Sequence, residues 1–280
     1  MIWLRALLSP AAFGLGLGVW AFGIEPRRLR VRRATLYTEK WPVDRPPLRI
    51  AAISDLHVGA PHMNLAKLEH VVRTVNGLKA DVVALLGDYV IHGVLFGRFV
   101  HPRPIAERLG QIQARLGVVS VLGNHDWWHD GPGIRREMER FGIQVLENDV
   151  ASVGGDGPPL WIAGLADSST RIPKAKETVS RVPEGEPVIV LAHDPAAFAD
   201  VPSRAVLTLA GHTHGGQVNL SRVRHLVSLP HLLDGHGRGW VRGQGKTMFV
   251  TTGLGTSVVP LRFDTPPEIA LITIRRPAQG

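Results

Sequence analysis

The sequence predicts a single α/β domain built as a sandwich of two sheets with covering helices. Five short, continuous apolar runs are rich in β-branched residues, which is typical of strands covered on both faces. Each run leads into a short polar segment, at the strand end where open α/β sheets usually place ligands. The five runs cover residues 48–53, 81–86, 118–122, 188–192 and 206–210.

The segments around these runs supply the other elements of the predicted fold. Apolar residues at helical spacing predict three helices, and further apolar runs predict three more strands. These elements cover 29–37 (strand), 65–78, 105–116 and 134–141 (helices), and 248–251 and 268–274 (strands). Asn64 directly precedes the first helix and can cap it. No internal repeat or linker interrupts the chain after residue 45.

Composition limits the class of protein. At 280 residues the chain is long enough for a sizeable core, and 44% hydrophobic with 20% charged residues excludes a disordered chain. The absence of cysteine excludes disulfides and thiolate zinc sites. The net charge of +8 has two interpretations, a solvated basic surface or attraction to anionic lipids or a phosphate substrate. Nucleic acid is disfavoured as a partner, because the basic residues do not lie among stacking aromatics.

The polar segments at the strand ends are rich in metal-binding side chains. In chain order they are Asp55-Leu56-His57, Gly87-Asp88, Gly123-Asn124-His125-Asp126, His193-Asp194 and Gly211-His212-Thr213-His214. Together they offer carboxylate, imidazole and amide ligands without sulfur, a set that suits manganese, iron or zinc. If these ligands converge, they would hold two divalent metal ions, which clamp the attacking and leaving oxygens of a phosphoryl transfer.

This series of segments resembles the calcineurin-like metallophosphoesterase family. The resemblance covers roughly residues 48–274, and all five segments are intact. The later segments are similar to the bacterial membrane-associated branch that includes the YkuE- and YaeI-type phosphoesterases; these segments are 212–217 (HTHGGQ), 253–257 (GLGTS), 262–263 (RF) and 266–268 (PPE). The resemblance implies a four-layer α/β/β/α sandwich of two mixed sheets, with residues 31–280 as the catalytic domain.

The resemblance also implies roles for individual residues. One metal ion would be bound by Asp55, His57 and His214, the other by Asn124, His193 and His212, and Asp88 would bridge the two. His125 would lie beside the phosphate, where it stabilises charge or protonates the leaving oxygen. Asp126 has two interpretations, orienting His125 or capping a helix.

These roles lead to an expected activity, hydrolysis of a phosphodiester or pyrophosphate bond by attack of a metal-bound hydroxide. Relatives in the broad family hydrolyse UDP-2,3-diacylglucosamine in lipid A synthesis, so a lipid-linked substrate of this kind is the leading expectation. A phosphodiesterase or phosphomonoesterase of loose specificity is the alternative. A non-catalytic scaffold on the same fold is disfavoured, because such relatives usually lose ligands or the histidine that corresponds to His125.

Residues near the polar segments have open interpretations. The apolar segment Val90–Val100 packs as a core lid or, with Trp127 and Trp128, holds an acyl chain or dips into a membrane. His92 and His129 lie near the polar segments, so they are candidates for substrate contacts. The other histidines are interpreted as surface residues; these are His62, His70, His101, His225, His231 and His236.

The N-terminal residues 1–30 are predicted to anchor the protein in the inner membrane. Residues 6–24 carry no charge and are about long enough to cross a bilayer, although Pro10 and four glycines weaken the helix. Arg5 precedes this stretch and five arginines follow it, so the catalytic domain would face the cytoplasm. A cleaved signal peptide is the competing interpretation, because Ala21-Phe22-Gly23 is a passable cleavage site.

Overall fold

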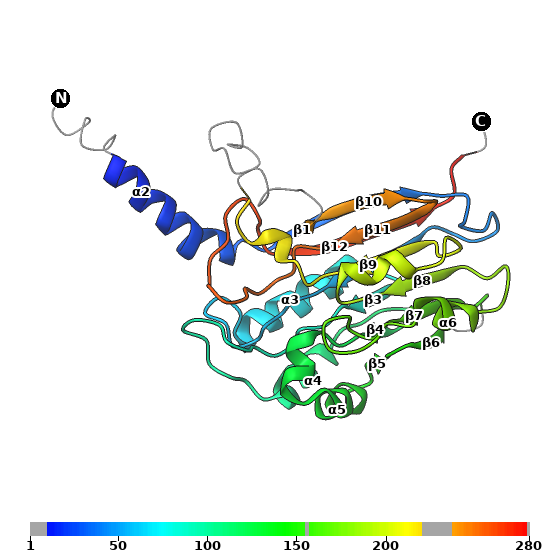
Figure 1. Ribbon diagram of the computed structural model, residues 1–280, viewed down its shortest axis with the longest axis horizontal. Coiled ribbons are helices and arrows are strands. Elements are labelled where there is room, and N and C mark those ends of the chain that lie inside the picture. The colour runs from blue at the N-terminus through cyan, green and yellow to red at the C-terminus, as the bar shows by residue number, and fades with distance from the viewer. Residues whose placement is uncertain (1–9, 155–156, 220–236, 279–280) are drawn as a thin grey trace.

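A computed structural model describes residues 10–154, 157–219 and 237–278. Within these residues the chain forms two six-stranded mixed sheets that pack face to face (Figure 1). The first sheet has the order β1 (Arg30–Tyr37), β12 (Glu268–Arg275), β2 (Leu48–Ile53), β3 (Val82–Leu85), β4 (Val118–Ser120) and β5 (Gln144–Val145). The second has the order β10 (Gly239–Gly243), β11 (Lys246–Val250), β9 (Leu207–Ala210), β8 (Val188–Leu191), β7 (Leu160–Gly164) and β6 (Asp149–Val153).

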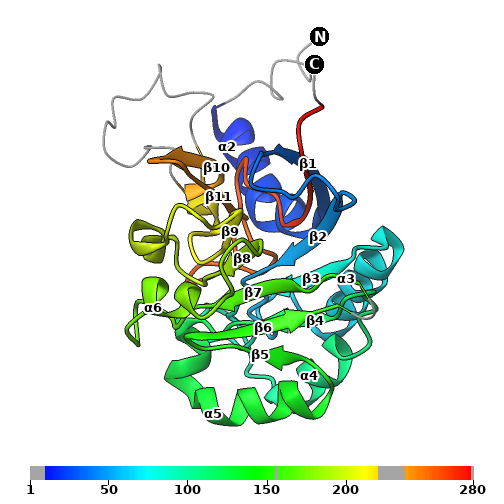
Figure 2. The same cartoon turned by 90° about the vertical axis from the view of Figure 1, so that its right-hand side faces the viewer.

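Helices cover the outer faces of both sheets, so the fold has four layers (Figure 2). The first sheet is covered by α3 (Leu65–Leu78), α4 (Pro102–Leu109) and α5 (Asn124–Arg140). The second sheet is covered by α6 (Ala175–Ser180) and the 3₁₀ turn η3 (Pro195–Asp200). This arrangement confirms the predicted α/β/β/α sandwich of two mixed sheets.

The central strands are apolar because each faces two cores. In β2, Ile50 and Ala52 enter the core between the two sheets, whereas Ala51 and Ile53 enter the core under the helices. Side chains of a strand point alternately to its two faces, so both faces of β2 are buried. The buried central strands β2, β3, β4, β8 and β9 are the five apolar runs that the sequence shows.

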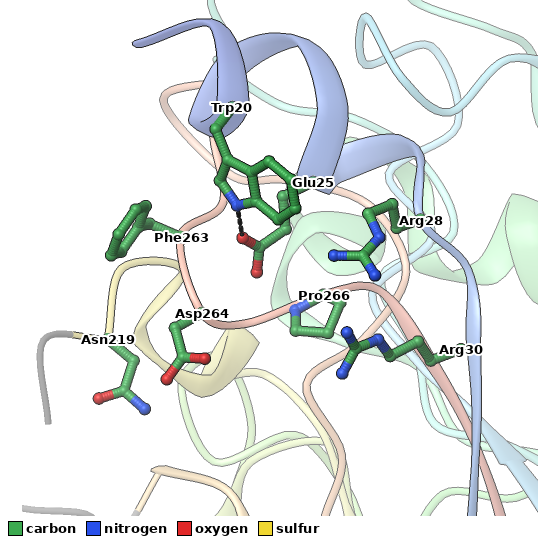
Figure 3. A pocket seen from close by; sticks show the side chains of 8 residues that line it. All are labelled: Trp20, Glu25, Arg28, Arg30, Asn219, Phe263, Asp264 and Pro266. Atoms are coloured by element: carbon green, nitrogen blue, oxygen red, sulfur yellow. Dashed lines mark hydrogen bonds between the residues drawn. The ribbon is translucent and has the colours of Figure 1, made fainter. Parts of the chain in front are cut away.

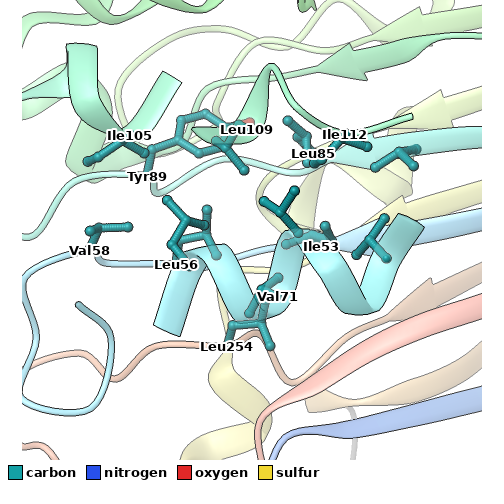
Figure 4. Packing of buried hydrophobic residues seen from close by; sticks show 14 of the residues in the cluster. Ile53, Leu56, Val58, Val71, Leu85, Tyr89, Ile105, Leu109, Ile112 and Leu254 are labelled. Atoms are coloured by element: carbon teal, nitrogen blue, oxygen red, sulfur yellow. The ribbon is translucent and has the colours of Figure 1, made fainter. Parts of the chain in front are cut away.

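Helix α3 illustrates how the sequence determines the outer layer. The Asn64 side chain accepts a hydrogen bond from the Lys67 N–H at 2.9 Å, as predicted for a capping residue. The buried residues of α3 recur at helical spacing and are Leu68, Val71, Val72, Val75 and Leu78. Figure 4 shows Val71 of this stripe among Ile53, Leu85 and Leu254. The helix therefore holds β2 and β3 in place from the outside.

Several elements differ from the sequence prediction. The edge strands β5, β6 and β10, strand β7 and the short helix α6 were not predicted, and most of these strands are short or partly exposed, so their apolar pattern is weak. Helix α4 ends at Leu109, before Gly110, whereas the apolar stripe predicts continuation to residue 116. Helix α5 begins at Asn124, inside the polar segment, ten residues before its apolar stripe begins at Ile134.

The N-terminal segment corrects another prediction. Its described part divides into α2 (Pro10–Gly18), the π-helical turn η1 (Val19–Ile24) and the 3₁₀ turn η2 (Glu25–Arg27). None of the helices in the described residues has the length and apolarity that a membrane span requires. The prediction of an inner-membrane anchor with a cytoplasm-facing domain is therefore wrong. Residues 1–9 lie outside the described residues.

Candidate metal centre

The polar segments meet at one edge of the sandwich. Asp55 and His57 follow β2, Asp88 follows β3, and Asn124 follows β4 in the first sheet. His193 follows β8, and His212 and His214 follow β9, in the second sheet. The parallel strands β2, β3 and β4 end at the same edge, as do the parallel strands β8 and β9. The structure therefore brings together all seven residues that the sequence proposes as ligands, in the groups described below.

The backbone around these residues is unusual. Five of the seven have a positive φ: Asp55 (53°), His57 (43°), Asp88 (59°), His212 (67°) and His214 (51°). This left-handed region costs a residue with a side chain about 1–2 kcal/mol. Such conformations persist where the surrounding structure requires them, and they concentrate at functional sites. The fold thus accepts backbone strain to direct these side chains inward.

The first cluster consists of Asp55, His57 and His214, and all three side chains are buried. The Nε2 atoms of His57 and His214 lie 3.1 Å apart, and His214 Nε2 lies 3.6 Å from Asp55 Oδ1. The Asp55 carboxylate also accepts hydrogen bonds from the His212 N–H, at 3.1 and 3.0 Å. This cluster joins the end of β2 to the end of β9.

The second cluster consists of Asn124, His193 and His212. His193 Nε2 lies 3.1 Å from Asn124 Oδ1 and 3.1 Å from His212 Nδ1. The other ring nitrogen of His193 is 2.7 Å from the Leu86 carbonyl, which fixes the orientation of the ring. His193 is fully buried and His212 is half-buried, so the cluster reaches from the core toward the surface.

Asp88 lies between the two clusters. Its Oδ2 is 3.5 Å from His57 Nε2 and 3.3 Å from His193 Nε2. Its Oδ1 accepts a hydrogen bond from the His125 backbone N–H at 2.9 Å, which leaves Oδ2 directed at both clusters. His125 Nε2 is 4.0 Å from the same Oδ2, so His125 borders the centre from the α5 side.

Burial and the Asp88–His193 ion pair set the protonation states of the centre. It lowers the pKa of His57 to about 4 and that of His214 well below its ordinary value, so both rings are neutral near pH 7. Burial also lowers the pKa of His193, but the nearby Asp88 carboxylate outweighs it and raises this pKa to about 10. In the same pair, burial raises the pKa of Asp88, while His193 brings it below its ordinary value. Asp88 is therefore a carboxylate.

Asp126 supports the loops of the centre. Its fully buried carboxylate accepts hydrogen bonds from the N–H groups of Asp88 (2.8 Å), Tyr89 (2.8 Å) and Gly123 (3.0 Å). This is the capping interpretation of Asp126, because Gly123 is the residue that precedes α5. His125 Nδ1 has no hydrogen-bond partner among the described residues. The bonds of Asp126 thus hold the backbone of Asp88 rather than the His125 ring.

The donor set fits divalent cations. Two pairs of imidazole nitrogens face each other at 3.1 Å, His57 with His214 and His193 with His212. A neutral imidazole has one nitrogen that carries no proton and can bind a cation, and His193 offers this form once its ring loses a proton. The carboxyl groups of Asp55 and Asp88 lie beside these pairs; burial raises the pKa of Asp55, whereas His193 keeps Asp88 ionised. The aspartates and histidines of the two clusters therefore fit a divalent dimetal site.

Arg262 contacts the centre although sequence reasoning gave it no role. It is fully buried, and its Nη2 lies 3.5 Å from His214 Nδ1. Burial lowers the pKa of Arg262 to about 10, so the guanidinium remains charged at neutral pH. No periodic pattern marks Arg262 in the sequence, and its inclusion in the segment RF at 262–263 is the one signal that could have found it.

Aromatic and apolar side chains border the centre on the α5 side. The Trp128 ring lies 5.0 Å from the His125 ring and 5.6 Å from the His92 ring, so His92 lies near His125. The His129 ring instead contacts Phe99, at 4.5 Å between ring centres. We use the name apolar strip for five exposed side chains of α5 and of the segments around residues 95–99 and 258, which are Leu95, Phe96, Phe99, Trp128 and Val258.

The segment Val90–Val100 is partly buried and partly exposed. Val90, Ile91 and Val94 are buried in the core, as a packed lid would be. Phe96 is 81% exposed, and the Leu95 N–H donates to the Val258 carbonyl at 2.9 Å, which holds the exposed part against the 258 loop. Of the histidines interpreted as surface residues, His70 and His101 are exposed and His62 is half-buried. His225, His231 and His236 lie outside the described residues.

Sequence comparison finds relatives along nearly the whole chain. Residues 48–216 match the model of the calcineurin-like phosphoesterase family. The metallophosphoesterase YkuE of Bacillus subtilis (strain 168) is 28% identical over 269 residues, which cover 94% of this chain and 91% of that protein. A transmembrane protein with a metallophosphoesterase domain from Danio rerio is 33% identical, and the match covers 85% of this chain and 55% of that protein.

Solved structures of similar fold have low sequence identity. A putative 5'-nucleotidase from Staphylococcus aureus matches with a TM-score of 0.49 and 11% identity, over 83% of this chain and 55% of that one. A dimetal phosphatase from Danio rerio matches with a TM-score of 0.41 and 12% identity, over 74% of this chain and 88% of that one. This chain thus spans about half the length of the nucleotidase.

Proposed function

Because this chain belongs to the calcineurin-like phosphoesterase family, in its YkuE-type branch, it is a hydrolase of phosphoester bonds, and we propose that it works with two divalent cations. The observation that carries this proposal is the convergence of two ligand clusters on the Asp88 carboxylate. Asp55, His57 and His214 would hold one cation, and Asn124, His193 and His212 the other. Asp88 would contact both.

The residues of the chain then have separate tasks in the reaction. Cations at this site would supply positive charge that polarises the phosphoryl oxygens and makes a nearby water more acidic. His125 forms a further possible ligand group with His57 and Asp88, and we assign it, as the family resemblance implies, the stabilisation of charge on the phosphoryl group or protonation of the leaving oxygen from Nε2. Asp126 fixes the backbone of Asp88 and so acts as a positioning residue. The ligand set suits manganese, iron or zinc.

An assay of the full chain tests this function. The purified protein is stripped of metal, reloaded with Mn²⁺, Zn²⁺ or Fe²⁺, and given a chromogenic phosphodiester and the corresponding monoester. We expect metal-dependent hydrolysis that is lost in Asp88→Asn and retained in His70→Ala, an exposed histidine of α3. Equal rates in wild type and Asp88→Asn would contradict the proposed mechanism. Absence of hydrolysis of every phosphoester would favour the non-catalytic scaffold.

A substrate with an apolar group is the finer proposal. The apolar strip exposes Phe96 at 81%, Leu95 at 51% and Trp128 at 53%. Trp128 lies against His125, so an acyl chain on this strip would extend from a phosphoester at the metal centre. Apolar patches beside a site commonly bind ligands. A lipid-linked phosphodiester or pyrophosphate, such as UDP-2,3-diacylglucosamine, combines both parts.

A comparison of two substrates separates this proposal from the alternative of loose specificity. The value of kcat/KM is measured for UDP-2,3-diacylglucosamine and for a water-soluble phosphodiester, with wild type and Phe96→Ser. The lipid-linked proposal predicts that Phe96→Ser lowers kcat/KM for the acylated substrate alone. Similar values for both substrates, with both unchanged in Phe96→Ser, would support the alternative of a general phosphodiesterase or phosphomonoesterase.

A further inference from the structure

Arg262 is the largest fully buried side chain in the described part of the protein. Its guanidinium donates hydrogen bonds to the carbonyls of Gly255 (Nε, 3.1 Å), Thr265 (Nη1, 2.8 Å) and Thr252 (Nη2, 2.9 Å). The same Nη2 lies 3.5 Å from His214 Nδ1. The ring of His214 is therefore held against a group that itself has several fixed partners.

The loop that Arg262 binds also packs on Asp55. The Gly255 N–H donates to the Asp55 carbonyl at 2.6 Å, and the Leu254 N–H donates to the Ser54 carbonyl at 3.0 Å. A side chain at Gly253 would overlap Asp55, because an added Cβ would lie 2.7 Å from the Asp55 Cβ. Arg262 therefore contacts His214 directly and Asp55 indirectly, through Gly255.

The N-terminal segment holds the chain around Arg262. The Arg262 backbone N–H donates to the Ala21 carbonyl at 3.0 Å. The Thr265 N–H donates to Glu25 Oε1 at 2.7 Å, and Trp20 Nε1 donates to Glu25 Oε2 at 2.5 Å. Figure 3 shows the Trp20–Glu25 bond above Phe263, Asp264 and Pro266. Both carboxylate oxygens of Glu25 are therefore occupied, one by the segment itself and one by the 262–265 loop.

The contacts between Glu25 and the chain around Arg262 lie in the protein interior. Glu25 is only 3% exposed, although it lies directly after an apolar segment whose side chains are largely exposed. Glu25, Asp55 and Glu268 are the carboxylates whose charge acts on the buried Arg262. Removing one partner from a buried charge network is costly, because it leaves uncompensated charge in the interior. The position of Arg262 thus depends on a residue of the N-terminal segment.

We propose that residues 20–25 brace the first ligand cluster, with Glu25 and Arg262 as positioning residues that hold His214 and Asp55 for metal binding. This inference rests on the proposed metal site, and it gives the segment that resembled a membrane anchor a role in the catalytic domain. It also places the start of that domain at or before residue 20, rather than at residue 31. Removal of residues 1–30 would delete both Ala21 and Glu25.

Metal affinity of the full chain tests the brace. Mn²⁺ and Co²⁺ binding is measured by chelator competition and by the visible absorption of Co²⁺, for wild type, Glu25→Ala, Glu25→Gln and the milder Trp20→Phe. Partners behind a metal ligand typically contribute about 10–100-fold to affinity. We expect Glu25→Ala to weaken one of two sites by about tenfold, to alter the Co²⁺ spectrum, and to leave the other site unchanged. Glu25→Gln keeps an acceptor for Thr265 and should lie between wild type and Glu25→Ala.

Glu184→Gln removes an exposed carboxylate and is the matched control, which should bind both ions as wild type does. Circular dichroism and thermal unfolding confirm that each variant is folded. Two unchanged sites in a folded Glu25→Ala protein would overturn the brace and leave the proposed function standing. Equal weakening of both sites would also overturn it, because the substitution would then destabilise the whole metal centre rather than the first ligand cluster. A wild-type chain that binds no metal would overturn the proposed function and the brace together.

Discussion

The Nε2 atoms of His57 and His214 lie 3.1 Å apart, although 157 residues separate them in the sequence. Burial lowers the pKa of both rings, to about 4 for His57, so neither is protonated at neutral pH. Two neutral rings whose ring nitrogens face each other in the interior are stabilised when a cation accepts both lone pairs. This pair links the first sheet to the second, so metal binding should also stabilise the fold.

Metal binding should therefore raise the melting temperature. A ligand at 100 times its Kd stabilises the native state by about 2.7 kcal/mol when it does not bind the unfolded chain. For a chain of 280 residues that corresponds to an increase in Tm of about 5 °C. Differential scanning calorimetry of the chelator-treated and the Mn²⁺-loaded protein measures this increase. Identical Tm values at saturating Mn²⁺ would contradict a metal site that joins the sheets.

Metal binding should also release a proton from His193. Without metal, the Asp88 carboxylate raises the pKa of His193 to about 10 against the effect of burial, so the ring is protonated at pH 7. Nε2 must lose its proton before it can bind a cation, so affinity should rise with pH across the neutral range. Calorimetric titration at pH 7 in two buffers of different ionisation enthalpy should show about one proton released per chain. The same heat in both buffers would refute the protonated His193.

His125→Ala should separate catalysis from metal binding. His125 lies 4.0 Å from Asp88 Oδ2 but belongs to neither ligand triad, so its loss should lower kcat by about 10²–10⁴-fold. The number of bound metal ions and their affinities should stay at the wild-type values, as should those of the control His70→Ala. If His125→Ala loses a metal ion, His125 is a ligand and the assigned role is incorrect.

Gly123→Ala should reduce activity through the position of Asp88. Gly123 has an extended backbone (φ −103°), so alanine causes no backbone strain there. An added Cβ would instead overlap the Asp88 carboxylate and lie 2.7 Å from His193 Cε1. Displacement of these groups by about 1 Å can cost about a hundredfold in rate.

Gly77→Ala is the matched control for this substitution. Gly77 lies within α3, and nothing lies within 4 Å of an added Cβ. Alanine should raise the free energy of unfolding there by about 0.5–1 kcal/mol without changing kcat/KM. Wild-type activity in Gly123→Ala would show that the carboxylate tolerates movement.

The sequence was sufficient for the central strands and insufficient for the edges. Strands such as β2 are buried on both faces, so their continuous apolar runs identify them. The edge strands β6 and β10 are partly exposed, and two of the five residues of β10 are glycine, so no pattern distinguishes them from loops. The first turn of α5 was missed because its residues serve the centre and not the core.

The convergence of the candidate ligands was predictable where they follow a strand, because strand ends meet at one edge of a sheet. The support behind these residues was not predictable. Arg262 and Glu25 are 237 positions apart and are joined through Thr265, a contact that depends on the folded path of the chain and not on local pattern. The same N-terminal residues misled the prediction of an anchor, because hydropathy alone does not register that Glu25 is buried against the domain.

The number of metal ions bound per active chain tests the central claim most directly. The full-length protein is loaded with Mn²⁺, freed of excess metal, and measured by elemental analysis together with its rate of phosphodiester hydrolysis. The two ligand clusters around Asp88 predict two ions per chain at full activity, and fewer than two in Asp88→Asn. Full activity with one ion per chain, or with none, would contradict the account.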